Sequence, residues 1–163
     1  MGEELGSAIM VALCDAKRQP ERFKLENPEM TATVFNRQLE KCQVEYFDNY
    51  LCHSMNRDSW QKAKDFKVVE YLTEQKKLGK IKNLGFSFHD TADVLEKAIE
   101  CFPPDFVQLQ INYLDWENTA IESKKCYEVC LKHNKPIIVM EPVKGGLLVN
   151  VPEEAKTLFH EDS

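Results

Sequence analysis

The sequence predicts an α/β fold with a parallel sheet, and two observations carry that prediction. Segments with apolar residues at helical spacing alternate along the chain with short apolar runs, and helices that alternate with strands indicate a parallel sheet. The short runs also recur at roughly 25–35-residue spacing, which is the length of a β/α repeat. The chain has 163 residues, enough to bury one hydrophobic core.

The clearest single unit is the stretch GKIKNLGFSFHD, which follows a helical run and predicts a strand at 81–88. That strand ends in the polar residues Ser87, His89 and Asp90, and Thr91 is able to cap the next helix. In β/α folds the carboxyl ends of the strands hold the chemistry. We therefore expect Ser87 to contact a ligand and Asp90 to cap a helix.

The remaining elements follow from apolar spacing and from helix-start signals such as Asn27-Pro28-Glu29. The strand nearest the C-terminus is almost wholly apolar, which is typical of a strand covered on both faces. A further strand is expected near 8–14, and Pro152 starts one more helix. We expect helices at 27–43, 60–78, 91–102 and 118–133, and strands at 44–52, 105–113 and 135–140.

Polar residues at the strand ends favour one arrangement of the sheet. His53, Ser87, Gln108 and Met140 each lie at or near the end of a different expected strand. A barrel gathers residues from many strand ends at one mouth, whereas a doubly wound sheet concentrates them at one switch point. We therefore expect a partial (β/α)₈ TIM barrel, because a closed barrel needs about 250 residues.

Two groups at these strand ends suggest a polar ligand. A histidine at His53 can polarise a carbonyl or donate a proton at neutral pH, although a solvated structural histidine explains a lone residue equally well. Gln108, Gln110 and Asn112 alternate, so they share one face of their strand. Buried amides are costly unless they pair with each other, with water or with a ligand. The row therefore indicates a polar ligand in the barrel.

The loop EPVKGG, residues 141–146, follows the next strand and is rich in backbone donors. Such a loop can wrap a phosphate, although a short Gly-Gly is weak evidence alone. The sequence has no GxGxxG and no P-loop, so a dinucleotide would not bind by the Rossmann route.

Composition argues against several classes of partner. Acidic residues outnumber basic ones by 27 to 21, for a net charge of −6, which argues against non-specific binding to nucleic acid or anionic lipid. No apolar run is long enough to cross a bilayer, and the acidic N-terminus does not resemble a secretory signal. The six cysteines form no CxxC pair, so we expect no metal site and no disulfides. We expect a cytoplasmic protein.

Four runs then match a known family in order: YFDNYLCHS, GKIKNLGFSFHDT, DFVQLQINYLDWEN and KPIIVMEPVKGG. Together they resemble the aldo-keto reductases over residues 27–150. The nearest likeness is to predicted reductases that often carry a C-terminal ferredoxin-like segment. The resemblance implies a (β/α)₈ barrel that binds NADP(H) at its mouth and reduces carbonyls to alcohols. By this resemblance, residues 27–163 form a partial reductase domain that contains about strands four to seven of the barrel. Residues 1–26 form a poorly defined segment that could contain a remnant of one more strand.

The resemblance also implies roles for individual residues. His53 matches the catalytic histidine that orients the carbonyl oxygen. Ser87 and Gln108 match the side chains that hold the nicotinamide carboxamide, whereas Phe88 replaces an asparagine of that site. Met140 stands where many members stack a tyrosine on the nicotinamide ring.

The loop that covers the pyrophosphate in that family matches at Pro142, Gly145 and Gly146. Other parts have no counterpart in this sequence: the catalytic tyrosine, aspartate and lysine, the basic segment that reads the 2′-phosphate, and the iron–sulfur cysteines. We therefore expect an incomplete chain with weak turnover or none.

Two alternatives remain open from the residues alone. His53, His89, Asp90 and Glu141 are acceptable metal ligands at successive strand ends, as in a barrel-type metal-dependent hydrolase. The chain could also be a non-catalytic half-barrel that self-associates through its open edges.

Overall fold

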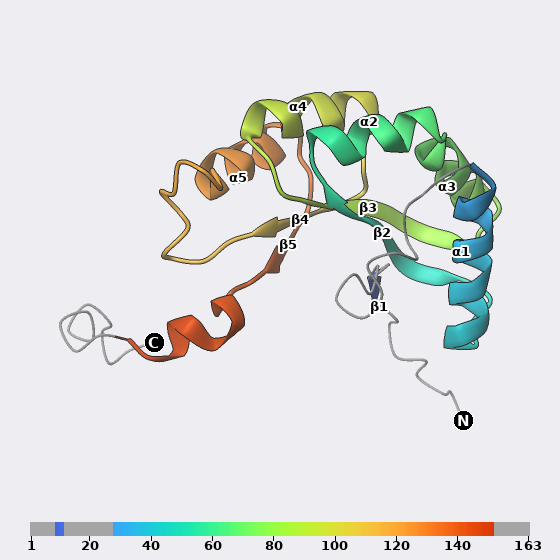
Figure 1. Ribbon diagram of the computed structural model, residues 1–163, viewed down its shortest axis with the longest axis horizontal. Helices are drawn as coiled ribbons and strands as arrows, with labels where there is room; N and C mark the ends of the chain where they lie inside the picture. The colour runs from blue at the N-terminus through green and yellow to red at the C-terminus, as the bar shows by residue number, and fades with distance from the viewer. Residues whose placement is uncertain (1–8, 12–27, 152–163) are drawn as a thin grey trace.

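The computed structural model describes residues 9–11 and 28–151, which form one parallel sheet with helices along one side (Figure 1). No helix in these two ranges is long and apolar enough to cross a membrane. The elements are β1 Ile9–Val11, α1 Pro28–Cys42, β2 Phe47–Met55, α2 Arg57–Asp65, α3 Val68–Lys77, β3 Ile81–Phe88, α4 Ala92–Cys101, β4 Val107–Gln110, α5 Ser123–Lys132, β5 Ile137–Met140 and the 3₁₀ segment η1 Lys144–Val149.

The sheet has the strand order β1-β2-β3-β4-β5, and each strand runs parallel to its neighbours. Helices α1 to α5 lie along the outside of the arched sheet, with α3 between α1 and α2, and no α-helix of the described ranges covers its inner face (Figure 1). A doubly wound sheet has helices on both faces and a reversal of strand order. The sequential order and one-sided helices are those of an arc of a (β/α)₈ barrel, so the predicted partial barrel is confirmed.

The hydrophobic core lies between the sheet and the helices. Phe35 of α1 packs edge-on against Phe47, Tyr50 and Tyr71, with ring centroids 5.8, 5.2 and 6.1 Å away. Fully burying one large apolar side chain stabilises a fold by about 1.5–3 kcal/mol. The helical pattern 28–42 and the strand 81–88 agree with the sequence expectations because both bury an apolar face in this core.

Strand β5 differs from the expectation that both of its faces are covered. Val139 is 49% exposed, and its neighbours in the strand are only half-buried. The reason is position: β5 is the last strand of the described sheet, and no α-helix among the described residues lies over it. An apolar sequence therefore predicted the strand correctly but not its burial.

The expected helix at 60–78 is two helices, α2 and α3. Lys67 between them has a φ of 52°, a left-handed conformation that ends one helical ladder before the next begins. Strand β2 also continues to Met55, past the expected end at Cys52, so His53 lies inside the strand rather than after it.

Helix α5 begins five residues later than expected. Asn118, read from the sequence as the first helical residue, accepts hydrogen bonds from the backbone N–H groups of Ala120 and Ile121 at 2.8 and 3.2 Å. This side-chain turn competes with helix formation. Glu122 then has a φ of 51° and marks the start of α5.

The absence of a side chain at Gly85 allows the residue before β4 to pack closely against β3. Its neighbours Leu84 and Phe86 are buried in the helix-side core, so Gly85 faces the inner side of the sheet. A Cβ atom there would lie 2.5 Å from the carbonyl oxygen of Phe106 and 2.7 Å from its ring. The residue that leads into β4 therefore packs directly on β3.

The N-terminal expectation is tested only at 9–11, which form β1 and pair with β2. The rest of 1–26 and the helix expected from Pro152 lie outside the described residues.

Candidate functional site

Three of the expected cofactor residues share the inner face at the carboxyl edge of the sheet. Ser87 of β3 pairs in register with Gln108 of β4, and Gln110 pairs with Met140 of β5. Paired residues of parallel strands point to the same side, and residues two apart share a face. The fold therefore brings Ser87, Gln108 and Met140 together across three adjacent strands.

His53 reaches this edge through a bulge in β2. Cys52 pairs with Phe86 and Met55 pairs with Phe88, so two residues, His53 and Ser54, stand opposite one residue of β3. Ser54 has a φ of 57°, as expected where an extra residue must be accommodated. The alternating strand pattern gave no signal of this bulge.

The bulge is held by Ser87. Its Oγ accepts a hydrogen bond of 2.7 Å from the Ser54 backbone N–H, and its side chain is buried. The Ser54 carbonyl accepts a second hydrogen bond of 2.9 Å from the hydroxyl of Ser59. Because this contact uses Ser87 Oγ only as an acceptor, the hydroxyl proton is still able to bind a carbonyl oxygen of a ligand.

Two histidines interact electrostatically at this edge. Burial lowers the pKa of His53 from its ordinary value of 6.5. Burial also lowers the pKa of His89; the charge of His53 lowers it further, and Glu141 partly opposes the shift. Both rings are therefore neutral at pH 7, and each has one N–H donor and one acceptor nitrogen. We call His53, Ser54, Ser87 and His89 the histidine side of the site.

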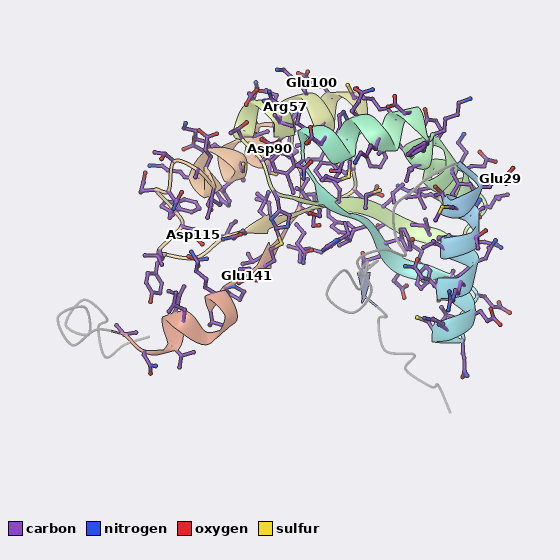
Figure 2. All side chains as sticks on the ribbon, in the orientation of Figure 1. Glu29, Arg57, Asp90, Glu100, Asp115 and Glu141 are labelled. Atoms are coloured by element: carbon purple, nitrogen blue, oxygen red, sulfur yellow. The ribbon has the colours of Figure 1, made fainter. Side chains whose placement is uncertain are left out.

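Asp90 has the capping role that the sequence suggested, but for a different helix. Its carboxylate accepts hydrogen bonds of 2.8 Å from the backbone N–H groups of Arg57, at the start of α2, and of Thr91; Figure 2 labels Arg57 and Asp90 close together. Burial raises the pKa of Asp90, but these hydrogen bonds outweigh it and the pKa is lowered. Helix α4 is capped instead by Glu122, which accepts from Ala92 N–H at 3.0 Å.

A buried carboxylate that the sequence did not single out explains most of the amide row. Asp115 has an exposed fraction of 0%. Its Oδ2 accepts hydrogen bonds of 2.8 Å from the side-chain amides of both Gln110 and Asn112. Its Oδ1 lies 2.5 Å from Lys144 Nζ. We call Gln110, Asn112, Asp115 and Lys144 the aspartate side of the site.

The aspartate side keeps its charge. Burial raises the pKa of Asp115, but the hydrogen bonds from Lys144, Gln110 and Asn112 outweigh burial, and the pKa is lowered. Two of the three amides in the row are thus occupied by protein. Gln108 is half-buried, and no hydrogen bond joins its side chain to another residue of the described ranges, so its amide is available to a ligand.

The loop after β5 is tied to the same carboxylate. Pro142, Gly145 and Gly146, the residues expected to cover a pyrophosphate, are exposed, and Lys144 between them contacts Asp115. Asn112 also donates a hydrogen bond of 3.1 Å to the Glu141 carbonyl. Figure 2 shows Asp115 and Glu141 at the exits of β4 and β5.

A cavity at the strand ends does not contain the cofactor candidates. A cavity of about 130 Å³ lies between the ends of β3 and β4 and the start of α5, lined in part by His89, Gln110 and Cys126. Small-molecule pockets usually hold ~300–1,000 Å³. Ser87, Gln108 and Met140 lie instead on the inner face of the sheet, where Ser87 is buried and Gln108 and Met140 are half-buried.

A metal site at the mouth finds little support in the geometry. Within the described ranges, the only three side chains whose ligand atoms could share one ion are Glu96, Glu100 and His133. They belong to α4 and to the end of α5, on the helix layer. His53, His89, Asp90 and Glu141 do not form such a group.

Comparison with solved structures places the fold among the aldo-keto reductases. An aldo/keto reductase from Brucella melitensis is 24% identical, with a TM-score of 0.56 over 72% of this chain and 43% of its own. An aldo-keto reductase, MGS-M4, from a Medee basin deep-sea metagenome library is 20% identical, with a TM-score of 0.64 over 81% and 46%. One from Klebsiella pneumoniae, in complex with NADP and acetate, is 22% identical, with a TM-score of 0.53 over 72% and 39%.

The chain therefore spans less than half the length of these solved proteins. None of the curated proteins matches it. The sequence profile of the Aldo/keto reductase family matches residues 16–162, which is most of the chain. The protein thus belongs to the aldo/keto reductase family.

Proposed function

We propose that this chain forms part of an oxidoreductase site that binds NADP(H) and places a carbonyl substrate beside it. The observation that carries the proposal is the alignment of Ser87, Gln108 and Met140 on one face of the adjacent strands β3, β4 and β5. His53 lies in the bulge near the end of β2, the strand next to β3. Family membership supports the same reaction class.

The residues fit a nicotinamide group. A carboxamide offers both donors and an acceptor, and Gln108, which no described residue occupies, offers the complementary pair. Ser87 supplies a hydroxyl donor beside it. Met140 supplies a polarizable thioether that packs against an aromatic ring, with less geometric specificity than a tyrosine. The Klebsiella relative was solved with NADP bound, which supports the choice of NADP(H).

The loop residues Pro142, Gly145 and Gly146 are assigned to the pyrophosphate. Both glycines have positive φ, 63° and 96°, and a Cβ at either would meet nothing within 4 Å. An exposed backbone without side chains allows close approach of phosphate oxygens, and the turn is held by a hydrogen bond of 2.9 Å from Gly146 N–H to the Val143 carbonyl.

The bound cofactor would supply a hydride to the carbonyl carbon. His53 is neutral at pH 7, so its ring N–H is able to donate a hydrogen bond to the carbonyl oxygen and orient it. Proton donation by a positioned acid typically contributes 10²–10⁴-fold to a rate, and no residue of this chain matches the family's tyrosine or lysine. We therefore propose that this chain alone turns over weakly or not at all.

The proposal extends to the state of the chain. Residues 27–163 are a partial reductase domain that functions in the cytoplasm. Val139 of β5, together with Leu147 and Val149 of η1, is exposed at the open end of the sheet. An uncovered apolar edge favours self-association, and light scattering over a range of concentrations measures it directly.

The test of function is NADPH binding to the purified chain, followed by cofactor fluorescence. We expect saturable binding, and Gln108→Ala weakens it roughly five- to thirtyfold through the loss of about two hydrogen bonds. His53→Ala leaves binding unchanged but removes any residual oxidation of NADPH by a panel of aldehydes.

Asn83→Ala is the matched control, because Asn83 is an amide on the same strand face as Ser87 but at the other end of β3, where it binds Asn49. Its NADPH affinity should equal that of the wild type. Failure of the wild type to bind NADPH, or equal loss in Asn83→Ala and Gln108→Ala, contradicts the proposal. Rapid aldehyde reduction that depends on His53 contradicts the expected weak turnover.

A further inference from the structure

The segment after β5 has an unfavourable backbone at two residues. Glu141 has a φ of 58° and Lys144 a φ of 48°. Residues other than glycine rarely adopt this left-handed conformation, and it costs free energy wherever it occurs. Such a conformation persists only when surrounding contacts hold it, so the contacts of these two residues determine where the segment lies.

Both residues are linked to the carboxylate of Asp115, Lys144 directly and Glu141 through Asn112. Lys144 Nζ lies 2.5 Å from Asp115 Oδ1, where the aspartate side chain is 1% exposed. The Glu141 carbonyl accepts from Asn112 Nδ2 at 3.1 Å, and the same amide donates to Asp115 Oδ2 at 2.8 Å. The Asp115 backbone N–H donates to Asn112 Oδ1 at 2.9 Å, which fixes the amide in turn.

We propose that Asp115 is a positioning residue that fixes the segment 141–146 through Lys144 and Asn112, and so presents Gly145 and Gly146 to the cofactor phosphates. The inference rests on the proposed function, because it assigns those glycines to a pyrophosphate. Asp115 does not touch the cofactor. It is buried beneath the segment and acts only through its two partners.

The ion pair also determines what Lys144 does. Its ammonium is paired with Asp115, so the segment offers a phosphate its backbone rather than a free cation. A lysine that bound phosphate directly would bind it more tightly once Asp115 lost its charge. A lysine that positions the segment would do the reverse.

Hydrogen exchange tests the positioning without any cofactor. The turn hydrogen bonds Lys144 N–H to Glu141 O and Gly146 N–H to Val143 O are 3.1 and 2.9 Å long. In Lys144→Met we expect exchange in the peptide 141–149 to accelerate about tenfold or more, the loss expected for one charge-assisted hydrogen bond. The peptide 81–88 of β3 should not change, and Lys144→Arg should restore slow exchange.

Lys82→Met is the matched control, because this substitution removes an ion pair of 2.7 Å between Lys82 and Asp48, which lies at the opposite end of the strands. Its exchange in 141–149 should equal that of the wild type. Unchanged exchange in Lys144→Met, or equal acceleration in Lys82→Met, overturns the inference.

NADPH affinity provides the second measurement. Lys144→Met and Asp115→Asn should both weaken binding about tenfold, and Lys144→Arg should restore it. Tighter binding by Asp115→Asn would show Lys144 to be a direct phosphate ligand and would overturn the positioning role. Faster exchange with unchanged affinity overturns it as well. If exchange is faster in Lys144→Met but the wild-type protein binds no NADPH, the proposed function is contradicted, whereas the role of Asp115 in fixing the segment is retained.

Discussion

The two sides of the site are organised by different physics. On the histidine side, Ser87 binds the backbone of a strand bulge and leaves its own proton available, while two neutral histidines lie in contact with solvent. On the aspartate side, one buried charge occupies two amides and a lysine. A polar residue at a strand end is therefore a ligand candidate only after its protein partners are known. By that measure Gln108 is a stronger candidate than Gln110 or Asn112.

The largest effect should follow from removing the charge of the aspartate side. Asp115→Ala leaves Gln110, Asn112 and Lys144 without their acceptor, and we expect the free energy of unfolding to fall by about 3–5 kcal/mol. Urea denaturation followed by circular dichroism measures it. Glu117→Ala, which removes an exposed partner of Lys124, should have almost no effect. A loss in Asp115→Ala no larger than in Glu117→Ala would show that the buried network contributes no stability.

A smaller effect is expected behind the histidine side, where α2 begins. The Asn56 side chain accepts hydrogen bonds from the N–H groups of Asp58 and Ser59 at 3.1 and 3.0 Å, and Ser59 Oγ accepts in return from Asn56 N–H. Loss of such a cap costs about 1 kcal/mol, so Asn56→Ala should lower the unfolding free energy by that amount. Asn56→Asp keeps the acceptor and should stay near the wild type; an equal loss in both variants would exclude capping as the cause.

The smallest effect is a pH dependence that belongs to the histidine side alone. The pKa values of His53 and His89 are lowered from 6.5 in the folded protein, so the unfolded chain binds more protons. Their contribution to stability is therefore complete above pH 6.5 and is lost as the pH falls below it. The carboxylates Asp90 and Asp115, with an ordinary pKa of 3.8, lose their contribution only at lower pH.

Unfolding free energies measured between pH 7.5 and 5 separate the two sides. His53→Gln and His89→Gln should each flatten the decline in that range, and the double variant should flatten it most. An unchanged slope in the double variant would assign the acid sensitivity to other groups.

Sequence patterns predicted the elements whose signals are local. The helix that begins at Pro28 and the strand 81–88 agree with the structure because helix-start signals and apolar spacing act within a few residues. The break at Lys67 carries no such signal, since a lysine in the left-handed conformation reflects how α2 and α3 pack. The covering of β5 depends on what lies next to it in space, which its apolar sequence does not encode.

The site was predictable in its position but less so in its contacts. Parallel strands place their carboxyl ends along one edge, so His53, Ser87, Gln108 and Met140 could be expected together. Asp115 was missed because it lies between the strand expected at 105–113 and the helix expected at 118–133, where no spacing pattern indicates a buried side chain. Its burial depends on Lys144, which lies 29 residues away. Long-range pairing of charges is invisible to spacing rules, and it changed the interpretation of the amide row.

The sequential order of the sheet has a consequence for how the chain folds. Each strand from β2 to β5 pairs with the strand before it in the described sheet, so each pairing can form once the later of its two strands has been made. Loop closure costs less entropy at a modest sequence separation than at a large one. Each new β/α unit can dock onto the one before it as the polypeptide leaves the ribosome. The order of the strands in the sheet thus permits assembly from β1 to β5 in the order of synthesis.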